Sequence, residues 1–182
     1  MKAMKTKMLI FVFLLGITDL FAQTLYVPGA IVKGKNASYY CAFENKLVVR
    51  VYNVNNVDTT TTMYYDDGTV VPFDEGSAVI ETKNEDLVRV FQEALTQEEI
   101  DILKSKITCS LQLDIVTDKQ GNTLEITFRL RNYDPVMTKF DPDRLYQLEQ
   151  NLKKVLKLNP SKADSSIKNM KYFLPISYKD LK

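Results

Sequence analysis

Residues 110–131 read SLQLDIVTDKQGNTLEITFRLR, and this stretch decides the fold. Apolar and polar residues alternate on both sides of its centre, which is the period of a β-strand with one buried face and one solvent-facing face. The centre, DKQGN at residues 118–122, has the composition of a turn. The stretch therefore predicts an antiparallel hairpin. Because a lone hairpin is marginally stable, another element must cover its apolar face.

A helix directly downstream is suited to cover that face. Residues 141–143, Asp-Pro-Asp, supply an N-cap, a proline at the first helical position and an acid in the first turn. Apolar residues then follow at helical spacing: Leu145, Leu148, Leu152, Val155 and Leu156. Asn159-Pro160 ends the helix, and residues 170–178 predict a last strand. We expect helix 143–157 to pack on the sheet that the hairpin and this last strand form.

The upstream half predicts two more hairpins and two short helices. Residues 39–53 are rich in β-branched and aromatic types, and residues 60–73 flank Asp66-Asp67-Gly68, which predicts a tight type I′ turn. Residues 85–106 change to helical spacing, with a break at Thr96, whose distance from Glu99 is that of a capping box. The fold class is therefore α+β, with N-terminal β-hairpins before a two-layer β-β-α-β unit. Regions 23–82 and 83–182 could form one continuous domain.

The first 22 residues have the pattern of a secretory signal peptide. Three lysines among residues 1–7 precede the apolar run 8–15, and small residues lead to a cleavage point after Ala22. Thr18 and Asp19 interrupt the apolar stretch, which favours cleavage over a membrane anchor. We expect an exported protein of a Gram-negative bacterium, periplasmic or extracellular, with no transmembrane segment after cleavage.

Composition removes several function classes. The chain has no histidine, which excludes Ser-His-Asp and Cys-His catalysis and histidine-ligated zinc. Its formal net charge of +1 provides no general field for nucleic acid, so no nucleic-acid partner is expected. No glycine-rich nucleotide-binding motif occurs, and the sequence indicates neither a cofactor nor a metal. We therefore expect that the protein is not an enzyme.

The two cysteines leave two alternatives open. Cys41 and Cys109 could form a disulfide in an oxidising compartment, or they could be two separate buried thiols. A bridge needs Cα atoms within about 7 Å of each other, and sequence alone does not show that distance.

Part of the chain resembles a known family. The hairpin 113–131 with its turn at Gly121, the helix from Asp141, the segment LKLNP at 156–160 and the strand KYFLPISY at 171–178 resemble the C-terminal domain of TonB-type proteins. The resemblance implies that domain's fold, and TonB-type proteins bind a receptor segment by adding a strand to the sheet. This chain lacks their proline-rich spacer. Taken whole, it resembles the uncharacterised secreted proteins of gut Bacteroidetes.

Two functions from different classes remain. The first is a non-catalytic module that binds another envelope protein through the edge of the final strand, with Lys171, Phe173, Pro175 and Tyr178 as its candidate residues. The second is a carboxylate-dependent hydrolase of glycans or peptides, for which Asp66-Asp67 and Asp74-Glu75 are candidates. Tyr39-Tyr40 and Tyr64-Tyr65 could line a sugar- or peptide-binding surface, although strand aromatics more often pack in the core. The sequence leaves the oligomeric state open.

Overall fold

The structure is a computed structural model that describes residues 24–60, 62–72, 79–105 and 110–181. The predicted signal peptide and Cys109 lie outside these ranges. Among the described residues, no helix combines the length and apolarity that a membrane span requires.

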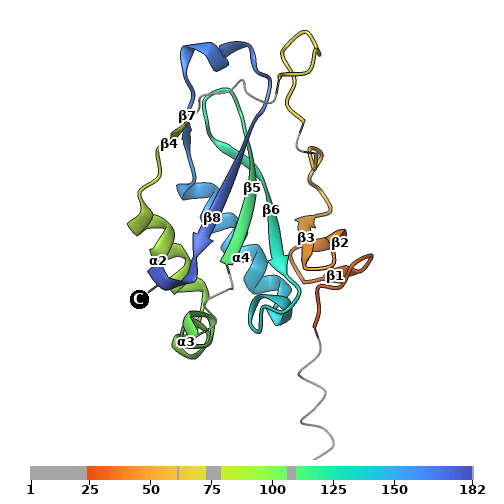
Figure 1. The fold of residues 1–182 in the computed structure, drawn as a ribbon, viewed down its shortest axis with the longest axis vertical. Coiled ribbons are helices and arrows are strands. Elements are labelled where there is room, and N and C mark those ends of the chain that lie inside the picture. The colour runs from red at the N-terminus through yellow and green to blue at the C-terminus, as the bar shows by residue number, and fades with distance from the viewer. Residues whose placement is uncertain (1–23, 61, 73–78, 106–109, 182) are drawn as a thin grey trace, which may run out of the picture.

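An antiparallel sheet with six strands forms one layer of the molecule (Figure 1). Its order is β1-β2-β3-β6-β5-β8, so the predicted hairpin 110–131 lies inside the sheet and the last strand forms one edge. The strands are β1 (Ile31–Lys33), β2 (Ser38–Asn45), β3 (Val48–Asn53), β5 (Ser110–Thr117), β6 (Thr123–Arg131) and β8 (Met170–Ser177). A separate two-stranded ladder pairs β4 (Val79–Ile80) with β7 (Leu158–Asn159).

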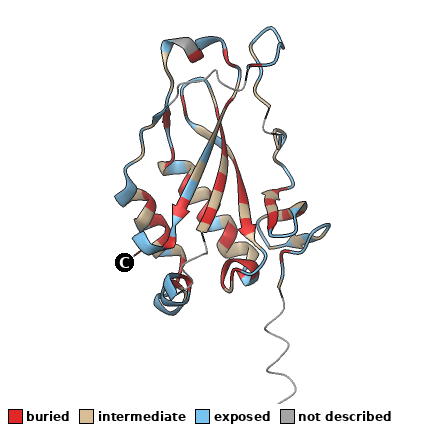
Figure 2. Ribbon diagram, in the orientation of Figure 1, coloured by how far each residue is buried: buried red, intermediate tan, exposed pale blue. Residues whose placement is uncertain are grey.

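Helices form the second layer, and α4 packs on the sheet as predicted (Figures 1 and 2). The α-helices are α2 (Asn84–Ala94), α3 (Gln97–Ser105) and α4 (Pro142–Val155), and short 3-10 helices are η2 (Met137–Lys139), η3 (Lys162–Ser166) and η4 (Tyr178–Asp180). Leu145, Leu148 and Leu152 of α4 are fully buried. They join Leu113 and Phe128 of the sheet in one core, which confirms the two-layer α+β prediction.

The N-terminal hairpin and the C-terminal unit share that sheet and that core. β3 pairs with β6, with Val51 opposite Phe128, and both side chains belong to the core. Cys41 of β2 lies in the same core as a free thiol, and burial raises its pKa to about 11. A buried thiol with a raised pKa is unreactive. Cys109 lies outside the described residues, and within those residues the structure shows no bridge.

Both predicted helix caps are present. In the capping box, the Thr96 amide donates to Glu99 Oε2 at 2.8 Å, and the Glu99 amide donates to Thr96 Oγ1 at 3.2 Å. Asp141 accepts from the amides of Asp143 and Arg144 at the start of α4. These bonds satisfy amide donors that the first helical turn leaves free.

The second upstream hairpin differs from the prediction. Only Tyr64 and Val70 form a bridge, and among the turn residues only Gly68 has a positive φ, at +84°. A type I′ turn needs positive φ at two residues, which would strain Asp67. The chain instead uses a three-residue turn, in which the Gly68 amide donates to the Tyr65 carbonyl and the Tyr65 amide donates to the Thr69 carbonyl. The type I′ prediction is therefore wrong.

Candidate functional site

The sheet face opposite α4 carries polar and aromatic side chains that come from five neighbouring strands. Strand alternation points these residues away from the core. Successive pairing aligns one row across the sheet: Tyr40, Tyr52, Thr127, Asp114 and Phe173. The next row is Ala42, Arg50, Arg129, Gln112 and Pro175. We call this surface the open face.

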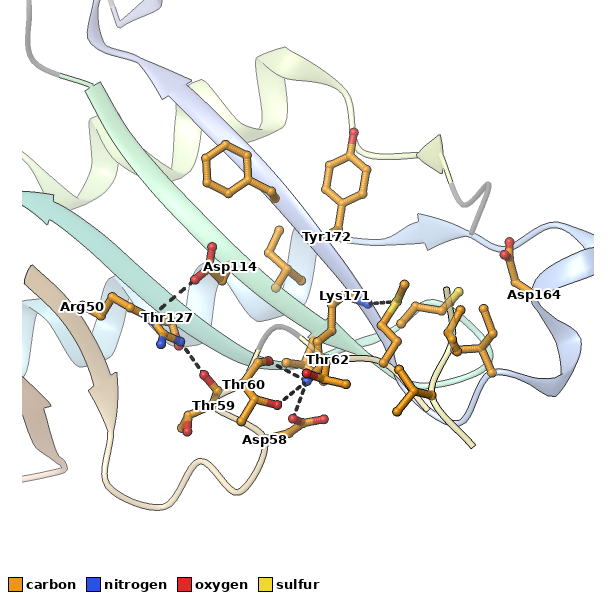
Figure 3. A pocket seen from close by; sticks show the side chains of 18 of the residues that line it. Arg50, Asp58, Thr59, Thr60, Thr62, Asp114, Thr127, Asp164, Lys171 and Tyr172 are labelled. Atoms are coloured by element: carbon orange, nitrogen blue, oxygen red, sulfur yellow. Dashed lines mark hydrogen bonds and ion pairs between the residues drawn. The ribbon is translucent and has the colours of Figure 1, made fainter. Parts of the chain in front are cut away.

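A cavity of about 650 Å³ lies between the open face and residues 58–60 and 62–72 (Figure 3). Its floor includes Arg50, Asp114 and Arg129 of the sheet, and threonines 59, 60 and 62 line its other side. Its other end is apolar, since Val71, Ile167 and Met170 form a small second core there. The cavity therefore has a polar, charged end and an apolar end.

Charged groups at the floor form one network. Arg129 donates from Nη1 to Asp114 Oδ1 at 3.3 Å and from Nη2 to Glu44 Oε1. Its guanidinium carbon also lies 5.3 Å from the centre of the Phe173 ring, a distance typical of a cation–π contact. Arg50 Nε lies 3.7 Å from Asp114 Oδ2. Burial raises the pKa of the Asp114 carboxyl above its ordinary value, although both guanidiniums act in the opposite direction.

Residues 56–60, which we call the strap, cross the sheet beside the cavity. The amides of Val57 and Asp58 donate to the two oxygens of Glu125, at 2.8 and 3.1 Å. The Lys171 ammonium donates to Asp58 Oδ1 at 2.5 Å and to the Thr60 carbonyl at 2.6 Å (Figure 3). Arg50 donates to the Thr59 carbonyl. Ionisable side chains of the sheet therefore hold the strap in place.

Three of the four predicted edge residues lie on β8. Lys171 does not project freely from the edge, because its side chain is 11% exposed and bonds to the strap. Phe173 is 45% exposed and faces the cavity, and Pro175 is exposed. Tyr178 follows the strand in η4, where it is buried, and its hydroxyl donates to Asp134 Oδ2 at 2.8 Å. Tyr178 is therefore a core residue, contrary to the prediction for it.

Asp66 and Asp67, one of the two predicted carboxylate pairs, do not line the cavity. Asp67 Oδ1 accepts from the Thr69 amide and hydroxyl within the turn, and Asp66 pairs with Lys119 at 2.5 Å. Residues 74–75 lie outside the described residues. The acids that line the cavity are Asp58, Asp114 and Asp164, which the sequence analysis did not select. In the described part of the chain, no cluster of three or more acidic, cysteine or histidine side chains could hold a metal ion.

The chain was compared with known proteins. No protein-family model matches the sequence, and no curated protein matches it. Among solved structures, a crystal structure of a DUF5043 family protein from Bacteroides uniformis matches with a TM-score of 0.69, covering 85% of this chain and 88% of the other. The fold of this chain is therefore similar to that of a DUF5043 family protein. The two sequences are 17% identical, so the likeness to the DUF5043 protein concerns the fold. It is consistent with an uncharacterised Bacteroidetes family.

Proposed function

We propose that the chain is an exported, non-catalytic module that binds another envelope protein by strand addition at the outer edge of β8. The observation that carries this proposal is the place of β8 at the end of the sheet, where one side of its backbone has no neighbouring strand in the described structure. An extended segment can add to such an edge through main-chain hydrogen bonds.

The direction of the β8 amides supports this use of the edge. The Lys171 amide donates outward to Met63 Sδ at 3.4 Å, away from β5. Since amide direction alternates along a strand, the amides of Phe173 and Ser177 also point outward, and Pro175 has no amide hydrogen. The bridge between Tyr65 and Ile167 covers the chain just before β8. The segment 173–177 is therefore the part of the edge that a partner can reach.

Two cavities, one on each face of the sheet beside β8, support the same proposal. The large cavity borders Phe173 on the open face. A smaller cavity of about 100 Å³ lies between α2 and the end of β8, lined by Leu87, Phe91 and Pro175 among others. Side chains of an added strand alternate between the two faces of the sheet. A bound segment could thus place one side chain in each hollow, which would give the interaction its specificity.

Strand addition can be tested with paired proline variants. Ser177→Pro removes an outward amide from β8, and Ile31→Pro is the matched control in β1, the strand at the opposite edge. A photo-crosslinking residue at position 175 should capture a partner in the source cells, and the same residue at the exposed position 43 should not. With that partner purified, Ser177→Pro should weaken binding at least tenfold in calorimetry. Equal affinity of the two proline variants would contradict strand addition.

A hydrolase is the second candidate, because one acid in the cavity has a raised pKa. Asp114 has that property, but it already bonds to Arg129, and Asp58 pairs with Lys171. The contact with Arg129 favours the ionised form of Asp114, whereas a general acid must hold a proton. Turnover on a polysaccharide panel that is lost in Asp114→Asn would favour the hydrolase over the binding module.

A further inference from the structure

The open face carries an inference that does not require strand addition, although it uses the same large cavity beside Phe173. We propose that its polar end binds an uncharged oligosaccharide, with a sugar ring against Phe173 and sugar hydroxyls bonded by Asp114, Arg50 and Arg129.

Aromatic rings stand at both ends of the row that crosses the open face. Tyr40 and Tyr52 form a pair with ring centres 5.6 Å apart on β2 and β3, and Phe173 lies on β8. Three strand spacings separate Tyr52 from Phe173, which is about 14 Å at the usual spacing. Arg129 lies over the Phe173 ring, and the side chain remains 45% exposed. Exposed aromatic rings offer an apolar surface on which the C–H face of a sugar can stack.

The charged groups beside this row are planar, held in place by one another and partly exposed. Arg50, Asp114 and Arg129 each keep about a fifth of the side chain exposed. Arg50 Nε, Arg129 Nε and Asp114 Oδ2 are buried atoms, and Arg50 Nε faces Asp114 Oδ2 at 3.7 Å, so a ligand bonds to the exposed part of these side chains. A hydroxyl can both donate to a carboxylate and accept from a guanidinium, so sugar hydroxyls match this set of groups.

The charge balance of the cavity favours an uncharged ligand. Its lining has three cations, Arg50, Arg129 and Lys171, and three acids, Asp58, Asp114 and Asp164. Each of the three cations contacts an acid. An anionic polymer or lipid headgroup would have to displace one of those acids, at the cost of a buried unpaired charge. The open face presents side chains to a ligand and has no free strand edge. An added peptide strand needs such an edge, so this face suits a sugar better.

Binding can be measured on the mature chain with a panel of neutral α- and β-linked glucans, mannans, xylans and galactans, together with acidic polygalacturonate. Affinity electrophoresis identifies the binding glycan, and calorimetry with its hexasaccharide gives the affinity. Phe173→Ala and the near-isosteric Asp114→Asn should each weaken binding tenfold or more. Phe43→Ala is the matched control, because Phe43 is 65% exposed and does not line the cavity, and it should leave the affinity unchanged.

Several outcomes would overturn the proposal. These are no binding across the neutral panel, binding of polygalacturonate alone, or equal affinities of Phe173→Ala and Phe43→Ala. Binding of a peptide that Phe173→Ala abolishes, with no neutral glycan bound, would assign the face to polypeptide instead. Ser177→Pro separates this site from strand addition, because it should weaken protein binding and leave the glycan affinity intact. Unchanged thermal unfolding of each variant shows that the fold is retained.

Discussion

Replacing Gly121 with alanine should destabilise the fold by about 2–3 kcal/mol. Gly121 closes the β5–β6 hairpin with φ at +82°, and an alanine in that conformation costs about 1–2 kcal/mol. An added Cβ would also lie 1.9 Å from the Leu158 carbonyl oxygen and 2.8 Å from its carbon. Since both atoms belong to the backbone, the β7 segment must move. That movement would break the 2.9 Å bond from the Leu158 amide to the Gly121 carbonyl, worth about 1 kcal/mol.

Gly68 provides a matched control for this effect. Its φ is +84°, and nothing lies within 4 Å of an added Cβ, so Gly68→Ala should cost only the conformational term, about 1–2 kcal/mol. Urea unfolding of both variants measures the two free energies, and an unchanged m-value shows that the same surface is exposed. The difference between the variants isolates the close approach of the two backbones. Equal destabilisation of Gly121→Ala and Gly68→Ala would refute this reasoning.

Further predictions concern the helices. Thr96→Ala should lower the free energy of unfolding by about 1 kcal/mol and Thr96→Ser by much less, measured by urea unfolding, because serine keeps the capping oxygen. Hydrogen bonds from Arg144 lower the pKa of Glu99 below its ordinary value of 4.5, so the pair stabilises the fold above that pH and this contribution is lost as the pH falls through the folded-state pKa. Glu99→Gln should therefore flatten the acid limb of a stability-against-pH curve, and an unchanged limb would contradict this. Leu148→Ala removes a fully buried side chain and should cost about 2–5 kcal/mol in the same unfolding assay, whereas a loss below about 1 kcal/mol would mean that α4 does not seal the sheet.

The sequence predicts the elements that depend on local patterns. Alternation in 110–131, the cap at Asp141 and the pairing of Thr96 with Glu99 each involve residues a few positions apart, and the structure contains all three. Two local predictions are wrong for identifiable reasons. Asp67 would need a positive φ in a type I′ turn. Tyr178 continues the aromatic pattern of β8, but the strand ends one residue earlier, and the chain then turns its ring into the core.

The polar end of the cavity could not be predicted in the same way. The alternation of polar and apolar residues places Asp114 and Arg129 on the solvent-facing side of their hairpin, but Arg50 belongs to a different hairpin. Only the pairing of β3 with β6 brings Arg50 opposite Arg129, and no short-range pattern in the sequence specifies which strands from distant hairpins become neighbours. The cavity also depends on the strap, which side chains of the sheet hold in place. Contacts of this kind leave no periodic pattern in the sequence.

The pairing of β3 with β6 also determines how the chain can be divided. Each strand satisfies the backbone hydrogen bonds on one side of the other, and their buried side chains lie in a common interior. A fragment cut between the two regions would expose an unprotected strand edge on each piece, and such edges promote aggregation. We therefore expect the two regions to fold as one unit, so that an expression fragment needs both of them.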